Sequence, residues 1–119
     1  MEELAILLEA CEPRLNRYRF WRVRLGRDLF GRWNVRVTAG RIGGAGRTFR
    51  YDFGSREGAA AFVEARLKRR RGAPRRCGVA YRLIEASSGT QDFFDPDTIR
   101  TLIESPPRRT AQSSAPDAI

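Results

Sequence analysis

The sequence contains no histidine and only two cysteines among its 119 residues. The absence of histidine excludes Ser-His-Asp and Cys-His nucleophile systems and every histidine-based metal site. Cys11 and Cys77 are too few for a zinc cage and lack CxxC spacing. The acidic residues of the central region occur singly, without an evident general acid–base pair. We therefore expect no catalytic residue, no metal and no cofactor, and a protein that is not an enzyme.

Long apolar runs are also missing, since none reaches the length of a membrane-spanning helix. The N-terminal sequence MEELAILLEACEP is acidic where a signal peptide begins with positive charge. We expect a cytoplasmic protein with no membrane partner. The length suits one small domain with tails, and the 41% of hydrophobic residues is enough for a globular fold.

Lysine is nearly absent, because Lys68 is the only one among 23 basic residues. The span from Arg14 to Arg82 holds 19 arginines and Lys68 against four acidic residues, a net charge of +16, whereas the whole chain carries +9. A basic centre between acidic flanks indicates a polyanionic partner, and the planar guanidinium is well suited to phosphate oxygens. The alternative is charge that serves only solubility.

Alternating apolar residues predict four strands. Residues 18–25 place Trp21, Val23 and Leu25 on one face and Arg22 and Arg24 on the other. The segment 32–38 alternates in the same way, with Arg36 on the polar face, and the segments 47–53 and 79–86 complete the set. The polar faces of the first two strands thus form an outward row of arginines.

Helical spacing predicts three helices. Residues 1–13 form an N-terminal helix with a stripe of Leu4, Leu7, Leu8 and Cys11. A main helix begins after Ser55 and ends at Gly72 and Pro74 with a basic run that either grips phosphate or is only solvated. Residues 87–104 form a linker and a short helix after Asp95 and Pro96, and residues 105–119 are expected to be disordered. The domain itself spans 14–86, an α+β fold in which about four antiparallel strands carry one main helix.

The glycine-rich segment 40–46, GRIGGAG, lies between two predicted strands. A phosphate-binding loop of the P-loop or dinucleotide type leads into a helix instead. We therefore interpret this segment as a hairpin connection.

The order of these motifs resembles the WGR domain, a module of DNA-dependent poly(ADP-ribose) polymerases and of short bacterial proteins. The likeness covers roughly residues 16–84 and rests on the aromatic opening strand, the DLFG-W segment, the Gly-Arg-Ile-Gly turn and the following Ala-rich helix. Ala39 stands where the family has the first residue of its Trp-Gly-Arg triplet, and Gly40 and Arg41 match the other two. The resemblance implies a bacterial DNA-binding module in which Gly40 and Arg41 take part.

These observations predict a non-enzymatic module that binds nucleic acid, DNA rather than RNA, by neutralising phosphates. The alternative is a protein-interaction module that binds an acidic protein or pairs as a homodimer, and a monomer is equally open. The predicted nucleic-acid-binding residues are Arg22, Arg24, Arg36, Gly40, Arg41, Arg47, Arg50, Arg69, Arg70 and Arg71.

Overall fold

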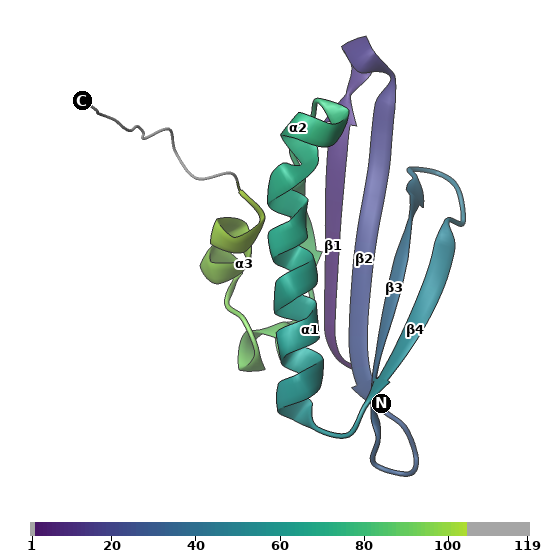
Figure 1. Ribbon diagram of the computed structural model, residues 1–119, viewed down its shortest axis with the longest axis vertical. Helices are drawn as coiled ribbons and strands as arrows, with labels where there is room; N and C mark the ends of the chain where they lie inside the picture. The colour runs from purple at the N-terminus through teal and green to yellow at the C-terminus, as the bar shows by residue number, and fades with distance from the viewer. Residues whose placement is uncertain (1, 105–119) are drawn as a thin grey trace, which may run out of the picture.

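The structure, a computed structural model, describes residues 2–104, in which five strands form one antiparallel sheet (Figure 1). The spatial order is β4-β3-β2-β1-β5, so the first strand is interior and the last is at an edge. The fold is α+β, as predicted, with one strand more than expected. The strands are β1 (Glu2–Glu12), β2 (Arg17–Arg27), β3 (Trp33–Arg41), β4 (Arg47–Phe53) and β5 (Arg82–Ala86).

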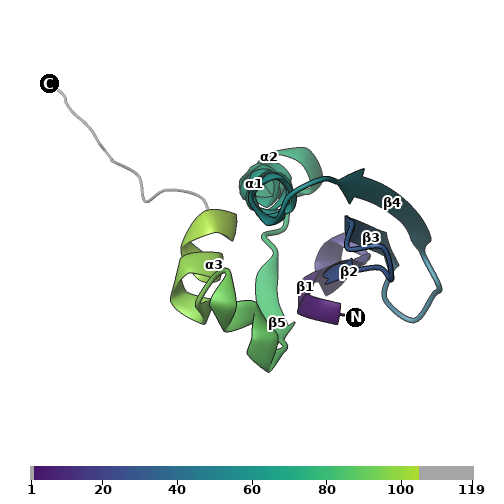
Figure 2. The same ribbon diagram turned by 90° about the horizontal axis from the view of Figure 1, so that it is seen from below.

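Three helices lie on one side of the sheet (Figure 2). The main helix α1 (Arg56–Arg69) is capped by Ser55, whose hydroxyl oxygen accepts the N–H of Gly58 at 3.0 Å. The main helix was expected to end at Gly72 and Pro74. Instead, the chain changes helix type there, because a 3-10 turn η2 (Arg70–Gly72) leads into α2 (Ala73–Cys77). The last helix, α3 (Pro96–Ile103), has the predicted cap at Asp95. Two more 3-10 turns are η1 (Pro13–Leu15) and η3 (Ser88–Asp92).

The predicted N-terminal helix is wrong, since residues 2–12 form β1. Leu4, Ile6, Leu8 and Ala10 alternate along the strand and are all buried, whereas Leu7 points to the other face. The segment has helix-forming composition, but β1 pairs with β2 on one side and β5 on the other. These long-range pairings override local propensity. The domain therefore begins with β1 and not at residue 14.

The core lies between the sheet and the helices. The first two predicted strands alternate as expected: Trp21, Val23 and Leu25 of β2 and Val35 and Val37 of β3 are buried. Ala59, Val63 and Leu67 of α1 pack against them. The opposite face of the sheet, which we call the outer face, bears the polar residues.

The glycine-rich segment is the predicted hairpin connection between β3 and β4. Gly40 and Gly46 approach so closely that a Cβ on Gly40 would lie 2.7 Å from the Gly46 Cα. A Cβ on Gly46 would lie 2.8 Å from the Phe20 ring, so the loop packs on that ring on the outer face. The predicted strand 79–86 is shorter than expected and begins at Arg82. The predicted tail 105–119 lies outside the described residues.

Candidate nucleic-acid interface

Three predicted arginines line up across the outer face. Arg24 of β2 lies directly opposite Arg36 of β3, and Arg36 lies opposite Arg50 of β4. Arg22 shares this face, but it is partly buried and its guanidinium carbon lies 5.7 Å from the centroid of the Phe20 ring. The predicted outward row of Arg22, Arg24 and Arg36 thus lies on this face, and Arg50 of β4 extends it.

Acidic side chains neutralise much of the row. Arg24 pairs with Glu2 at 3.6 Å and Arg50 with Asp52 at 3.2 Å. Beside them, Arg27 pairs with Glu3 at 2.9 Å. Directly opposed like charges repel, and these carboxylates offset that repulsion. The outer face is thus a weaker polyanion surface than the arginine count suggests.

The other predicted residues do not share this surface. Gly40 and Arg41 lie at the far end of β3, and Arg47, opposite Ala39, begins β4 on the helix side. The run 69–71 ends α1 and forms η2. The predicted residues therefore do not form one surface, because alternation and chain direction separate the outer face from this end of the sheet.

That end of the sheet gathers exposed arginines from five elements. It is the upper end in Figure 1, where α2 lies beside the connection of β1 to β2. None of these arginines forms an ion pair with a carboxylate within residues 2–104. We call this surface the basic end, made of Arg17, Arg19, Arg41, Arg47, Arg69, Arg75 and Arg76.

Neutral groups hold several of these guanidinium groups in place. Arg17 donates from Nε to the Cys77 carbonyl at 3.2 Å, and Arg76 donates to the Arg69 carbonyl at 3.2 Å. Arg41 donates to the Asn16 side-chain oxygen at 3.1 Å and lies 5.1 Å from the Tyr18 ring centroid. Carbonyl and ring contacts orient a cation without cancelling its charge.

A hollow of about 290 Å³ opens at the basic end. It lies where β2 begins and β3 ends, beside Asn16, which adopts a left-handed backbone conformation. The hollow combines three guanidinium groups with a phenol ring and an amide, which suits an anionic oxygen or a sugar-phosphate segment. Its lining residues are Asn16, Arg17, Tyr18, Arg19, Gly40 and Arg41.

Arg70 and Arg71 support the fold. Arg70 packs over Trp21 with 5.0 Å between guanidinium carbon and ring centroid, and its Nε is buried without a hydrogen-bond partner. Burial is the main reason that the pKa of Arg70 is lowered. Arg71 donates to the Leu102 carbonyl at 2.9 Å and so ties η2 to α3. Of this predicted trio, Arg69 is the exposed member.

The basic end includes four arginines that were not among the predicted binding residues. Arg17 and Arg19 precede or begin the first predicted strand, and Arg75 and Arg76 close the basic run. What these arginines share is their position, because each lies near the end of a strand or helix at the same end of the sheet. The sequence analysis did not bring these positions together, because it assigned residues 1–13 to a helix and not to a strand of the sheet.

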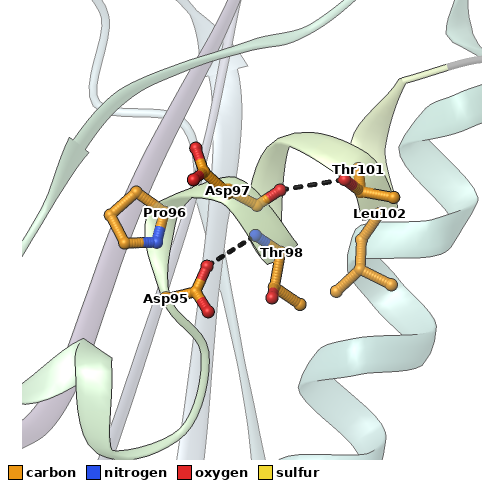
Figure 3. A pocket seen from close by; sticks show the side chains of 6 residues that line it. All are labelled: Asp95, Pro96, Asp97, Thr98, Thr101 and Leu102. Carbon is orange, nitrogen blue, oxygen red and sulfur yellow. Dashed lines mark hydrogen bonds between the residues drawn. The ribbon is translucent and has the colours of Figure 1, made fainter.

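A hollow of about 530 Å³ on α3 is a poor site for a polyanion (Figure 3). It lies on the first turn of α3, where Asp95 accepts the N–H of Thr98 at 2.8 Å and the Asp97 carbonyl accepts the Thr101 hydroxyl at 3.0 Å. Its two carboxylates would repel phosphate. Its lining residues are Asp95, Pro96, Asp97, Thr98, Thr101 and Leu102.

The hairpin between β2 and β3 ends in an apolar tip. Leu29 is 99% and Phe30 is 89% exposed. The Asp28 carboxylate accepts the N–H groups of Phe30 at 2.9 Å and Arg32 at 3.0 Å, and Gly31 has a positive φ of 79°. These bonds hold the turn in one conformation, at the end of the sheet opposite to the basic end (Figure 1).

Comparison with known proteins identifies the family. The family model of the WGR domain matches residues 4–76, well over half of the chain. The chain belongs to the WGR domain family. WGR domains are known as a nucleic-acid-binding module family. No curated protein matches the chain.

The match begins within β1 and ends within α2, so β5 and α3 lie outside the matched residues. Ala39, which the resemblance places at the motif tryptophan, lies opposite Trp21 and Arg47 on the helix side. Trp21 is buried and Trp33 partly buried against the core, as the alternation predicted.

Residues 2–104 contain no group of three or more Cys, Asp and Glu side chains placed to hold a metal ion. Within the same residues, the helices are too short or too polar to cross a membrane.

Proposed function

We propose that this WGR domain binds DNA without catalysing a reaction, and that it does so through the basic end in the cytoplasm of a bacterium. The observation that carries the proposal is the set of seven exposed arginines, none paired with a carboxylate among the described residues, several of which are oriented by a carbonyl, an amide or a ring.

Phosphate neutralisation is the mechanism that these groups support. Each guanidinium offers several N–H donors in a fixed plane, and Arg17 and Arg41 already aim theirs beside one hollow. A bound strand would displace counterions, so affinity falls with salt. The sequence has no recognition-helix or zinc-finger pattern, and binding is therefore expected to depend little on DNA sequence. The likeness to modules of DNA-dependent enzymes favours DNA over RNA.

A salt series tests the location of the site. Fluorescence polarisation with an end-labelled DNA duplex gives the slope of log affinity against log salt. Arg41→Ala and Arg75→Ala each remove one exposed cation from the basic end, and each is expected to reduce that slope by about 1. Arg50→Ala is the matched control, because Arg50 is exposed but paired with Asp52 on the outer face.

The outcomes separate three cases. Reduced slopes for Arg41→Ala and Arg75→Ala, with the slope of Arg50→Ala unchanged, support the basic end. An equal or larger effect of Arg50→Ala would move the site to the outer face. Undetectable binding at low ionic strength would remove DNA binding altogether. Thermal melting of each variant shows whether the fold is intact.

A second candidate function is protein interaction, and the apolar tip favours it. Monomers rarely expose two large neighbouring apolar side chains on a turn that is fixed by hydrogen bonds. The partner would be another protein or a second copy of this chain. Light scattering distinguishes a homodimer from a monomer, and replacing Leu29 and Phe30 by serine is expected to abolish any such dimer while DNA affinity is retained.

A further inference from the structure

One aromatic ring of β4 is open to solvent where its neighbours are covered. Phe49, Tyr51 and Phe53 lie on the helix side of the strand. The Phe62 ring of α1 covers Tyr51 at 4.6 Å and Phe53 at 5.2 Å between centroids. Phe49 has no ring partner among residues 2–104, and it is 49% exposed.

The Phe49 ring is exposed because β4 diverges from α1 and because the neighbouring residue on β3, Ala39, has a small side chain. In Figures 1 and 2 the beginning of β4 lies farther from α1 than its end does. Phe49 lies opposite Val37, and the next helix-side residue of β3 is Ala39. A diagonal neighbour of this kind lies within reach of a large side chain. The methyl group of Ala39 is too short to cover the ring.

One guanidinium group lies beside the Phe49 ring, and a second lies over the next helix-side ring of the strand. The guanidinium carbon of Arg47 lies 5.6 Å from the Phe49 ring centroid. On the other side, Arg66 lies over Tyr51 at 5.3 Å and over Phe62 at 4.8 Å. Arg47 belongs to the basic end, so the ring is continuous with the surface proposed to bind DNA.

We propose that Phe49 is a stacking platform for an unpaired base of single-stranded nucleic acid, with Arg47 and Arg66 holding the adjacent phosphates. This inference rests on the proposed function. Every base has a π face that stacks on an aromatic ring, and arginine adds cation–π attraction. Bases within a duplex are already covered by their neighbours, so only an unpaired base reaches the ring without unstacking. The two cations favour this anionic ligand over an apolar peptide.

The test compares the same substitution at two exposed phenylalanines. Phe49→Leu keeps the site apolar and removes the π face, Phe49→Trp keeps an aromatic face, and Phe30→Leu at the apolar tip is the matched control. Full-length protein is titrated with single-stranded DNA and with a blunt duplex of the same length. For single-stranded DNA, Phe49→Leu is expected to weaken binding about tenfold, whereas Phe49→Trp and Phe30→Leu change it less than about twofold.

Two further readouts separate stacking from charge and from fold. The salt slope of Phe49→Leu is expected to equal that of the unaltered protein, because no phosphate contact is lost. A 2-aminopurine base in the single strand is expected to be quenched on binding, and the quenching is lost in Phe49→Leu. The affinity for duplex is expected to stay within about twofold.

Three results would contradict the proposal, and each has a different meaning. If Phe49→Leu and Phe30→Leu bind single strands equally well, the platform is absent and DNA binding at the basic end stands. If Phe49→Leu weakens single-strand and duplex binding alike, the ring supports the fold and the inference is overturned. If the unaltered protein binds neither ligand at low salt, the proposed function fails and the platform with it.

Discussion

At the residue scale, arginine performs three different tasks in this domain. Arg41 presents its charge at the basic end, Arg24 balances a carboxylate, and Arg70 covers the Trp21 ring inside the protein. The sequence shows the same residue type at each position. What differs is the partner, and the partner is set by strand register and helix placement. Residue identity alone therefore predicts the charge of the surface better than it predicts the binding residues.

Gly40 is a residue whose lack of a side chain is required by its surroundings. A Cβ at this position would lie 2.7 Å from backbone of Gly46 and 3.5 Å from the Phe20 ring. Backbone cannot move aside as the end of a flexible side chain can. We expect Gly40→Val to lower the free energy of unfolding by about 1–3 kcal/mol, measured by urea denaturation.

Gly54→Val provides the control for this prediction. A Cβ at Gly54 meets nothing within 4 Å, and the residue lies between β4 and the cap of α1. The same substitution there is expected to change stability by about 0.5 kcal/mol or less. Equal losses at both glycines would show that crowding at Gly46 is not the cause.

At the element scale, β1 shows why a local pattern can mislead. Its sequence EELAILLEACE contains a helical stripe and also an alternating set of apolar residues. The residues that decide the outcome are far away in sequence: Leu8 lies opposite Trp21 on one side and Leu83 on the other. The residues immediately around Leu8 in the sequence do not reveal these pairings.

The strand assignment predicts unequal effects at two adjacent leucines. Leu8 is fully buried on the helix side, whereas Leu7 lies on the outer face and is partly exposed. Leu8→Ala is expected to destabilise the domain by about 2–5 kcal/mol, and Leu7→Ala by about 1 kcal/mol or less. Chemical denaturation of both variants measures the difference. Similar losses at both positions would contradict the alternation.

At the scale of the whole molecule, the sequence predicted the fold better than it predicted the interface. Alternation in residues 18–25 and 47–53 and the cap at Ser55 are local signals, and each was confirmed. Surface charge depends instead on contacts such as Arg24 with Glu2 and Arg17 with Cys77, which join residues from different elements. Such contacts are known only once strand order and register are known.

Global stability is expected to fall at high pH because of Tyr81. Burial is the main reason that the pKa of Tyr81 is raised above its ordinary value of 10.0, although nearby Arg70 and Arg19 oppose the shift. The unfolded phenol loses its proton at a lower pH than the folded one, so the unfolded state binds fewer protons above about pH 10. The stabilising contribution is complete below that pH and declines above it.

Thermal melts across this pH range test the prediction. Tyr81→Phe removes the ionisable group and keeps the ring, so its melting temperature is expected to decline less steeply between about pH 9 and 11 than that of the unaltered protein. Tyr18→Phe serves as the control. Parallel declines for all three proteins would assign the alkaline loss of stability to other groups.

The position of β1 between β2 and β5 has a consequence for translation on the ribosome. β1 pairs with β2 as soon as both have emerged, but its other edge stays open until residues 82–86 follow. A nascent chain halted before β5 would present that open edge, rich in leucine, to other chains. Pairing of β5 with β1 is thus the step that protects this edge of the sheet from aggregation.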